Sequence, residues 1–243
     1  MNHFKLIKID ATPSTSSLLR EMHAQKLLSG PTIVWAKHQT QGRGQRDRAW
    51  ISPPGENITL SVYSPLEGFR AQDAARLNMA ASMLLIDWLA ALDLPDLCVK
   101  WPNDILSGGK KIAGILIENF ISGDSLRATV MGLGINVNQT AFESLPQAQS
   151  LQLITGQVYD LEPLVAQLIE RLVGFFDAAV FEDPRLHARY ESRLFRKGER
   201  SAFIYDGQQF EGELQGVSAD GGCLIVRKGQ LVKYDTVLLK WLY

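Results

Sequence analysis

Two lysines, an aspartate and a pair of glycines are spaced so that they could build a site for an anion. Lys100 and Asp104 flank a Trp-Pro-Asn turn, and Lys111 follows shortly after. Gly132 and Gly134 stand two positions apart in a strand-like run, where glycine usually marks close approach by another group. A bulge and a surface lysine would explain one such glycine, but the combination favours a pocket for a flat or extended anion.

These residues belong to a predicted β-hairpin. The runs Lys111–Phe120 and Leu126–Asn136 are separated by a polar turn, and Gly108-Gly109 is a second turn signal just before them. Because side chains alternate between the faces of a strand, we expect Lys111 to share a face with Ala113 and Ile115. The same rule places Gly132, Gly134 and Asn136 together on one face of the partner strand.

The segment Gln39–Trp50 reads as a loop that is mobile until a ligand is present, because it contains two glycines and three arginines without periodicity. Clustered arginines repel one another unless an anion lies among them. The segment therefore favours phosphate binding, although a solvated basic loop is the alternative.

Helices and strands that would position these residues alternate along the first four fifths of the chain. We expect Ser or Thr in Asp10–Ser17 to cap a helix that carries Leu18, Leu19 and Met22. We also expect Trp88, in a later helix, to lie in the core. The expected strands are Phe4–Ile9, Thr32–His38, Asn57–Ser64 and Cys98–Trp101, and the expected helices are Asp73–Leu92, Asp160–Val180 and Arg185–Phe195. In the second of these helices, Asp160 is the expected N-cap, and the apolar stripe includes Phe175, Phe176 and Ala179. The segment Phe142–Ile154 is ambiguous.

The character of the sequence changes near Lys197-Gly198, after which short strands and glycine turns dominate. Ser201–Tyr243 is typical of a small barrel. The prediction is an α+β protein with a mixed sheet and flanking helices in residues 1–196 and a small C-terminal β-barrel in residues 197–243.

Composition narrows the class of protein. The 243 residues carry a net charge of −1, which draws the chain neither to nucleic acid nor to a membrane as a whole. No apolar run approaches the ~18 residues of a membrane span, so we expect a cytoplasmic protein. The two cysteines and four histidines have no metal-ligand spacing. The sequence contains no Walker A loop. It also contains no G-x-S-x-G elbow, which argues against a serine hydrolase.

Four segments taken together resemble the biotin–protein ligases in order and approximate spacing. They are Gly42–Trp50 (GRGQRDRAW), Lys100–Asp104 (KWPND), Lys111–Glu118 (KIAGILIE) and Gly132–Asn136 (GLGIN), preceded by Ser14-Thr15-Ser16. The resemblance covers nearly the whole chain. It implies a class II synthetase-like catalytic domain of the biotin–lipoate ligase type, followed by an SH3-like barrel.

The family resemblance implies a ligase reaction in two steps. The carboxylate of biotin attacks the α-phosphate of ATP, with Mg²⁺ present, to give biotinyl-5'-AMP and pyrophosphate. The amine of one lysine on a biotin carboxyl carrier domain, of acetyl-CoA carboxylase or another carboxylase, then attacks the acyl carbon. The chain starts at the catalytic domain, so DNA binding is not expected, and the sequence leaves monomer and homodimer both open.

The resemblance also assigns roles to residues. Lys111 would meet the biotin carboxylate and the acyl-phosphate. Lys100 and Arg48 would add positive charge, although a lysine that only extends its charge to solvent is the alternative for Lys100. Asp104 would bind metal or orient a lysine, although a turn-capping role is the alternative. The resemblance implies that Ser14, Thr15, Gln39 and the backbone of Arg43 meet the ureido ring, that Gly132 and Gly134 form the floor, and that Asn103 and Asn136 contact the adenylate. Trp50 would cover the adenine, although a simple hydrophobic anchor is the alternative. The remaining expected binding residues are Ser16, Gly42, Gly44, Gln45, Arg46 and Gly114. No metal-binding residue set of the protein's own is expected.

Two departures from the family pattern leave alternatives open. Ser16 stands where the family has asparagine, and Gln45 stands where it often has arginine. Either Arg46 or Arg48 compensates for Gln45, or the adenylate is held less tightly, and the release rate in Gln45→Arg distinguishes the two. A lipoate–protein ligase and a non-catalytic biotin-binding module are the remaining functional alternatives.

Overall fold

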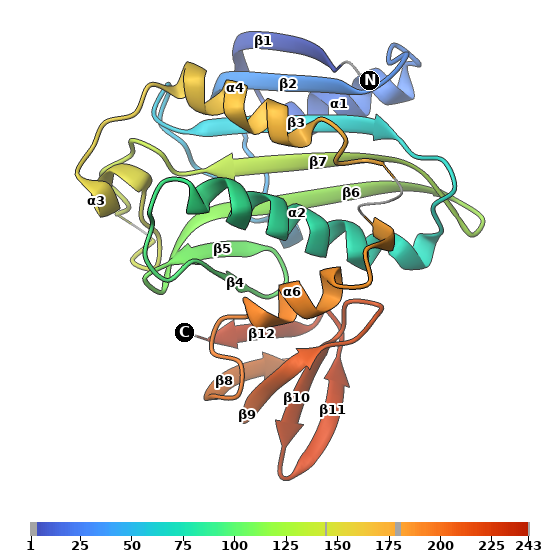
Figure 1. Ribbon diagram of the computed structural model, residues 1–243, viewed down its shortest axis with the longest axis vertical. Helices are drawn as coiled ribbons and strands as arrows, with labels where there is room; N and C mark the ends of the chain where they lie inside the picture. Colours follow the sequence, from blue (N-terminus) through green and yellow to red (C-terminus); the bar gives the residue numbers. More distant parts are fainter. Residues whose placement is uncertain (1–3, 144, 178–180, 243) are drawn as a thin grey trace.

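The computed structural model describes residues 4–143, 145–177 and 181–242, and its centre is a mixed sheet of seven strands (Figure 1). The spatial order is β1-β2-β3-β7-β6-β5-β4, in which β1 and β2 are parallel and the other neighbours are antiparallel. The strands are β1 (Lys5–Thr12), β2 (Thr32–Gln39), β3 (Ile58–Pro65), β4 (Cys98–Lys100), β5 (Asp104–Ser107), β6 (Lys110–Ser122) and β7 (Ser125–Ile135).

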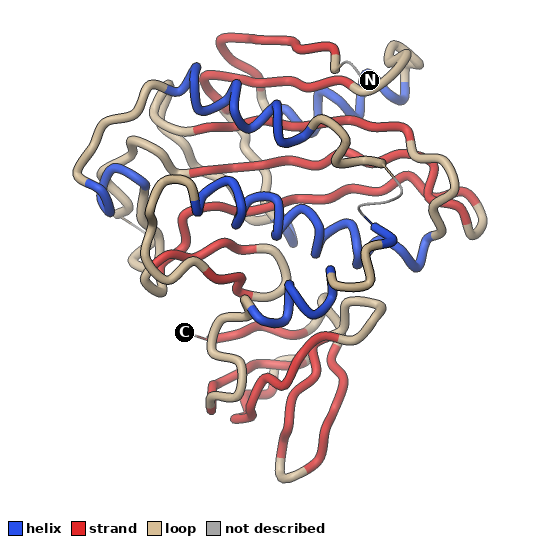
Figure 2. The backbone as a smooth tube through the Cα atoms, in the orientation of Figure 1, coloured by secondary structure: helices blue, strands red, loops and turns tan. Residues whose placement is uncertain are grey.

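Helices cover both faces of this sheet. They are α1 (Thr15–Ala24), α2 (Ala74–Ala90), α3 (Leu151–Thr155), α4 (Leu161–Leu172) and α6 (Leu186–Ser192). Alternation along β2 separates the faces, because Ile33 and Trp35 join the main core whereas Val34 packs in a smaller cluster with Leu19 of α1. The tube view shows α2 and α4 crossing the sheet on one side (Figure 2).

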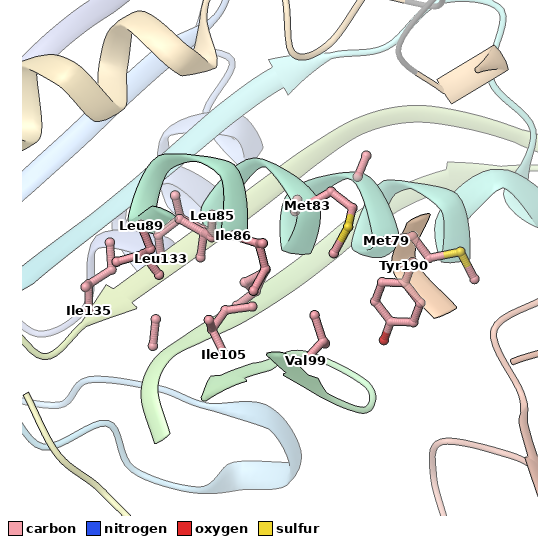
Figure 3. Packing of buried hydrophobic residues seen from close by; sticks show 14 of the residues in the cluster. Met79, Met83, Leu85, Ile86, Leu89, Val99, Ile105, Leu133, Ile135 and Tyr190 are labelled. Atoms are coloured by element: carbon pink, nitrogen blue, oxygen red, sulfur yellow. The ribbon is translucent and has the colours of Figure 1, made fainter. Parts of the chain in front are cut away.

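The main core forms where α2 lies against the central strands. Met83, Ile86 and Leu89 of α2 are buried among residues of β4, β5 and β7, including Val99, Ile105 and Leu133 (Figure 3). Trp88 is buried in this core, as the helical spacing predicts. Burial of large apolar side chains of this kind stabilises a fold by about 1.5–3 kcal/mol each.

The predicted hairpin is confirmed as β6 and β7, but the expected face of Lys111 is wrong. The pairing of β5 with β6 shifts register between Ile105 and Leu106, and the neighbours Ile112 and Ala113 both lie in the main core. A bulge of this kind adds one residue and inverts the alternation beyond it. Lys111 consequently shares a face with Gly114 rather than with Ala113.

The second correction concerns the helix expected at Asp160–Val180. Asp160 caps α4 as predicted, its carboxylate accepting from the Glu162 N–H, but α4 ends at Leu172. Val173 adopts extended angles and Gly174 has a φ of 78°, so the helix cannot continue. Phe175 and Phe176 still pack on the core from turns, and the expected end, Ala179 and Val180, lies outside the described residues.

The C-terminal strands, expected as a small barrel, form a five-stranded antiparallel sheet in the order β11-β10-β9-β8-β12. They are β8 (Arg200–Tyr205), β9 (Gln208–Val217), β10 (Cys223–Arg227), β11 (Gln230–Tyr234) and β12 (Leu239–Leu242). Phe203 and Trp241 of this sheet belong to the same apolar cluster as Leu194, which follows α6. The division at residue 196/197 stays a prediction.

Both cysteines are free thiols, Cys223 buried and Cys98 partly exposed. Burial raises the pKa of Cys98 to about 11 and that of Cys223 to about 12, so both remain protonated near neutrality. Within the described part of the chain, no helix is long and apolar enough to cross a membrane.

Candidate active site

A cavity of about 380 Å³ lies against the face of the central sheet opposite α2. The face follows from β7, where Leu133 and Ile135 pack in the core while Gly132 and Gly134 alternate with them. The cavity brings together all the predicted site residues except Gly42: Ser14, Thr15, Ser16, Gln39, Arg43, Gly44, Gln45, Arg46, Arg48, Trp50, Lys100, Asn103, Asp104, Lys111, Gly114, Gly132, Gly134 and Asn136.

Glycines clear the floor of this cavity, and the indole of Trp50 lies over them. A Cβ on Gly134 would stand 2.4–2.8 Å from three atoms of the Trp50 ring, and one on Gly114 would stand 3.1 Å from the Lys111 Nζ. Gly114 and Gly134 are direct partners across β6 and β7. The missing side chains therefore let a flat ring approach the backbone of the sheet.

Lys111 and Lys100 converge on the carboxylate of Asp104. The Lys111 Nζ is 2.6 Å from Asp104 Oδ1, and the Lys100 Nζ is 4.0 Å from Oδ2. The Lys111 Nζ also lies 5.4 Å from the centre of the Trp50 ring. Among the described residues that line the cavity, Asp104 is the single carboxylate, so cations prevail and the cavity suits an anion.

Burial sets the protonation of Lys100, whose side chain is only 13% exposed. Desolvation lowers the pKa of Lys100 to about 8, aided by the charges of Lys111, Arg48 and Arg46 and opposed by Asp104. Desolvation likewise lowers the pKa of Arg46. Charges taken from water in this way interact strongly with an anion that enters.

The turn that carries Lys100 and Asp104 is held from several sides. The carbonyl of Pro102 accepts from the Asn78 amide at 2.6 Å and from the Tyr190 hydroxyl at 2.8 Å. The indole N–H of Trp101 donates at 3.1 Å to the carbonyl of Gly221, in the turn between β9 and β10 of the C-terminal sheet. Anchoring by α2, α6 and the second sheet makes this turn a rigid wall.

Two arginines of the loop contact other parts of the protein in this structure. The Arg43 guanidinium pairs with both oxygens of Glu118 on β6, at 3.0 and 3.2 Å. The Arg46 guanidinium donates to the Leu239 carbonyl of β12 at 2.9 Å. These contacts fasten the loop to both sheets, because each arginine has a partner on the protein.

Three further predicted residues make contacts within the protein. The side-chain amide of Asn103 donates to the Ile115 carbonyl at 2.5 Å, and that of Asn136 donates to the Gln149 carbonyl at 3.1 Å. Gly42 does not line the cavity; it closes the base of the loop, where the Trp50 N–H donates to its carbonyl at 2.9 Å. A Cβ on Gly42 would stand 2.3 Å from the Trp50 carbonyl oxygen, which explains the glycine.

Hydroxyl groups close one end of the cavity. Ser14 caps α1 by accepting from the Ser17 N–H at 3.4 Å, which places Thr15 and Ser16 in the first turn. Thr15 contacts Gln39, and Ser61 of β3 bridges Thr15 and Ser16. Sequence reasoning missed Ser61, although alternation along β3 puts it on the face away from the core.

Two other groups of lining residues were missed. Phe142 and Leu145–Ala148 come from the segment predicted as ambiguous, and Leu239–Trp241 come from β12. The first segment is tied to the bulge, since the Lys111 N–H donates to the Gln147 carbonyl at 2.7 Å. Local sequence patterns do not predict that either group reaches the cavity, because each does so through contacts with segments that are distant in the sequence.

Within the residues that the structure describes, no group of three or more His, Cys, Asp or Glu side chains is placed to hold a metal ion. One cavity carboxylate, Asp104, matches the sparse protein ligation of a Mg²⁺ ion that is held mainly by substrate phosphates.

Comparison with known proteins defines the class. Residues 8–136 match the model of the biotin/lipoate A/B protein ligase family, and the chain belongs to this family of ligases. The matched range runs from β1 to the glycine pair of β7, so it contains most of the cavity floor.

Several relatives of this chain are named as biotin ligases. The chain is 34% identical to the biotin–[acetyl-CoA-carboxylase] ligase of Paracoccus denitrificans over 82% of this chain and 85% of that protein. It is 32% identical to the bifunctional ligase/repressor BirA of Bacillus spizizenii over 68% of this chain but only 51% of that protein. The solved biotin protein ligase of Aquifex aeolicus, in complex with biotin and ATP, superposes with a TM-score of 0.76 at 26% identity and 98% coverage of both chains.

Proposed function

We propose that this protein activates biotin with ATP to biotinyl-5'-AMP and transfers the biotin to a lysine of a biotin carboxyl carrier domain, of acetyl-CoA carboxylase or another biotin-dependent carboxylase. The observation that carries the proposal is the convergence of Lys111 and Lys100 on Asp104, beside a glycine floor, in a family of biotin and lipoate ligases. Two cations at one point of the cavity support the proposal, because they would offset the repulsion between two anionic substrates.

The first step joins the biotin carboxylate to the α-phosphorus of ATP. A carboxylate oxygen forms the new P–O bond while the bond to pyrophosphate breaks, and the electron pair leaves with pyrophosphate. Lys111 offsets repulsion between carboxylate and phosphate, and Lys100 adds positive charge from the rigid turn. Asp104 orients the Lys111 ammonium toward the floor, and a Mg²⁺ ion that accompanies ATP would share its carboxylate and stabilise charge on the phosphates.

In the second step the neutral amine of the carrier lysine attacks the acyl carbon, and AMP leaves. The amine must release a proton as the amide forms. Asp104 is the single carboxylate among the described residues that line the cavity, so we assign it as the acceptor of this proton. Trp50 on the glycine floor shields the intermediate from water, which would otherwise hydrolyse it.

The experiment is biotin transfer to a purified carrier domain with ATP and Mg²⁺. We expect one biotin per carrier domain and none on a carrier whose target lysine is replaced by arginine. Lipoate replaces biotin in a parallel reaction. Efficient transfer of lipoate without transfer of biotin would overturn the proposal in favour of a lipoate–protein ligase. If neither is transferred, the remaining alternative is a non-catalytic biotin-binding module.

A further inference from the structure

A chain of four polar side chains closes the end of the cavity beside Gly132. Thr15 and Ser16 come from α1, Gln39 from the end of β2 and Ser61 from the middle of β3. The Thr15 Oγ1 lies 3.0 Å from Gln39 Oε1 and 2.6 Å from the Ser61 Oγ, which in turn lies 2.9 Å from the Ser16 Oγ. Thr15, Ser16 and Ser61 are all buried, so their hydroxyl protons must be used within the chain or by a ligand.

The direction of each hydrogen bond in this chain follows from one backbone contact. The Thr15 N–H donates to Gln39 Oε1 at 2.8 Å, which requires an oxygen there and fixes the orientation of the amide. The Thr15 hydroxyl, 3.0 Å from the same oxygen, must donate its only proton to it. Ser61 must then donate to Thr15, and Ser16 must donate to Ser61.

Once these protons are spent, the hydroxyl wall can only accept hydrogen bonds. Each of the three oxygens keeps at least one lone pair, but none keeps a proton for a ligand. Gly132 is part of the arrangement, since a Cβ there would stand 2.6 Å from the Ser16 Oγ and displace it. The wall therefore selects a ring that carries N–H donors and disfavours one that has none, because unpaired buried oxygens are costly.

We propose that Ser61 is a specificity-determining residue: it accepts the Ser16 proton and donates its own to Thr15, so that the wall accepts the ureido N–H groups of biotin and disfavours a dithiolane ring. The inference rests on the proposed function and deepens it. It also gives a reason for Ser16, whose short side chain reaches Ser61 and completes the acceptor wall.

The first test is Ser61→Ala, with Ser64→Ala as the matched control. Ser64 is buried on the same strand but its hydroxyl donates to the Pro65 carbonyl, outside the cavity. We expect Ser61→Ala to raise the KM for biotin about tenfold, the effect of one lost hydrogen bond, while the KM for ATP and the kcat change less than about twofold. Ser64→Ala should leave all three unchanged. An unaltered KM for biotin in folded Ser61→Ala would overturn the inference.

The second test uses the natural protein and so does not depend on a variant that folds. Binding of biotin is compared with binding of two derivatives, each methylated on one ureido nitrogen. We expect at least one derivative to bind about tenfold or more weakly, and the gap to shrink in Ser61→Ala, where the Ser16 hydroxyl loses its acceptor and can turn toward the ligand. Equal affinity for biotin and both derivatives would overturn the acceptor wall. A protein that transfers no biotin at all would instead refute the proposed function.

Discussion

The charge of Lys100 responds to pH near neutrality, because burial lowers the pKa of its ammonium to about 8. The ammonium is present below that pH and is lost above it. If its charge assists attack on the α-phosphate, kcat/KM for biotin-dependent ATP–pyrophosphate exchange falls as pH rises through about 8. The pH profile of the exchange measures this directly.

Two variants make the assignment specific. Lys100→Arg keeps its charge at higher pH, so the fall in kcat/KM should move to more alkaline values. Lys110→Arg, at an exposed neighbouring position, should show the profile of the natural protein. A profile that is flat on both sides of the Lys100 pKa would contradict the role of this charge.

At the scale of elements, the loop Gly42–Trp50 is fastened at two points, to β6 through Arg43 and to β12 through Arg46. We expect Arg46→Ala to loosen it, because the guanidinium contact with the Leu239 carbonyl is lost. Hydrogen exchange of the loop amides should become faster, and the KM for ATP should rise several-fold. Arg200→Ala, an exposed arginine paired with Glu211, is the control and should change neither.

Unchanged exchange rates in Arg46→Ala would mean that the loop is held by Arg43 and Trp50 alone. That result would remove β12 from the account of loop closure. It would leave the cation pair at Asp104 untouched, since Lys100 and Lys111 lie on other elements.

Much of the element pattern is readable from the sequence, and the exceptions have local causes. The turn at Gly108-Gly109 has positive φ at both residues, as its type predicts. Strict alternation gave the wrong face for Lys111, because a bulge at Ile112 depends on pairing with β5 and on the segment near Gln147. Helical spacing overran α4, because apolar residues in turns after Gly174 continue the same core.

The candidate site likewise contains residues that the sequence predicts and residues that it does not. Residues in short motifs, such as Lys111 and Gly134, were predicted individually because glycine and lysine in strands are unusual. Ser61 was not predicted, since a serine in a strand is ordinary until its partners from α1 are known. The carbonyl that receives Arg46 is a backbone group, and no side-chain pattern identifies it.

At the scale of the whole molecule, α6 joins the C-terminal sheet to the central one. The Glu191 carboxylate accepts from the Val217 N–H at 2.8 Å, while the His187 ring donates to the Val217 carbonyl at 2.7 Å. A Cβ on Gly216 would stand 2.1 Å from Glu191 Oε1, so the two parts approach closely there. This contact holds α6 against the second sheet, whose strand β12 lines the cavity.

We expect Glu191→Ala to lower the free energy of unfolding by about 1–3 kcal/mol, because the Val217 N–H loses its partner. Thermal unfolding followed by calorimetry measures the change, and the midpoint should fall by several degrees. Glu199→Ala, at an exposed residue 3.8 Å from Arg196, should have little effect. Identical midpoints for the two variants would contradict the role of α6 in connecting the two sheets.

The most direct test of the central claim is biotin-dependent ATP–pyrophosphate exchange in the natural protein, Lys111→Ala and Lys110→Ala. Lys110 is exposed and outside the cavity, whereas Lys111 lies on the glycine floor beside Asp104. We predict exchange in the natural protein and in Lys110→Ala, and a loss of about 10²–10³-fold in Lys111→Ala, the range for one electrostatic contact in a transition state. Exchange at the natural rate in folded Lys111→Ala would contradict the account.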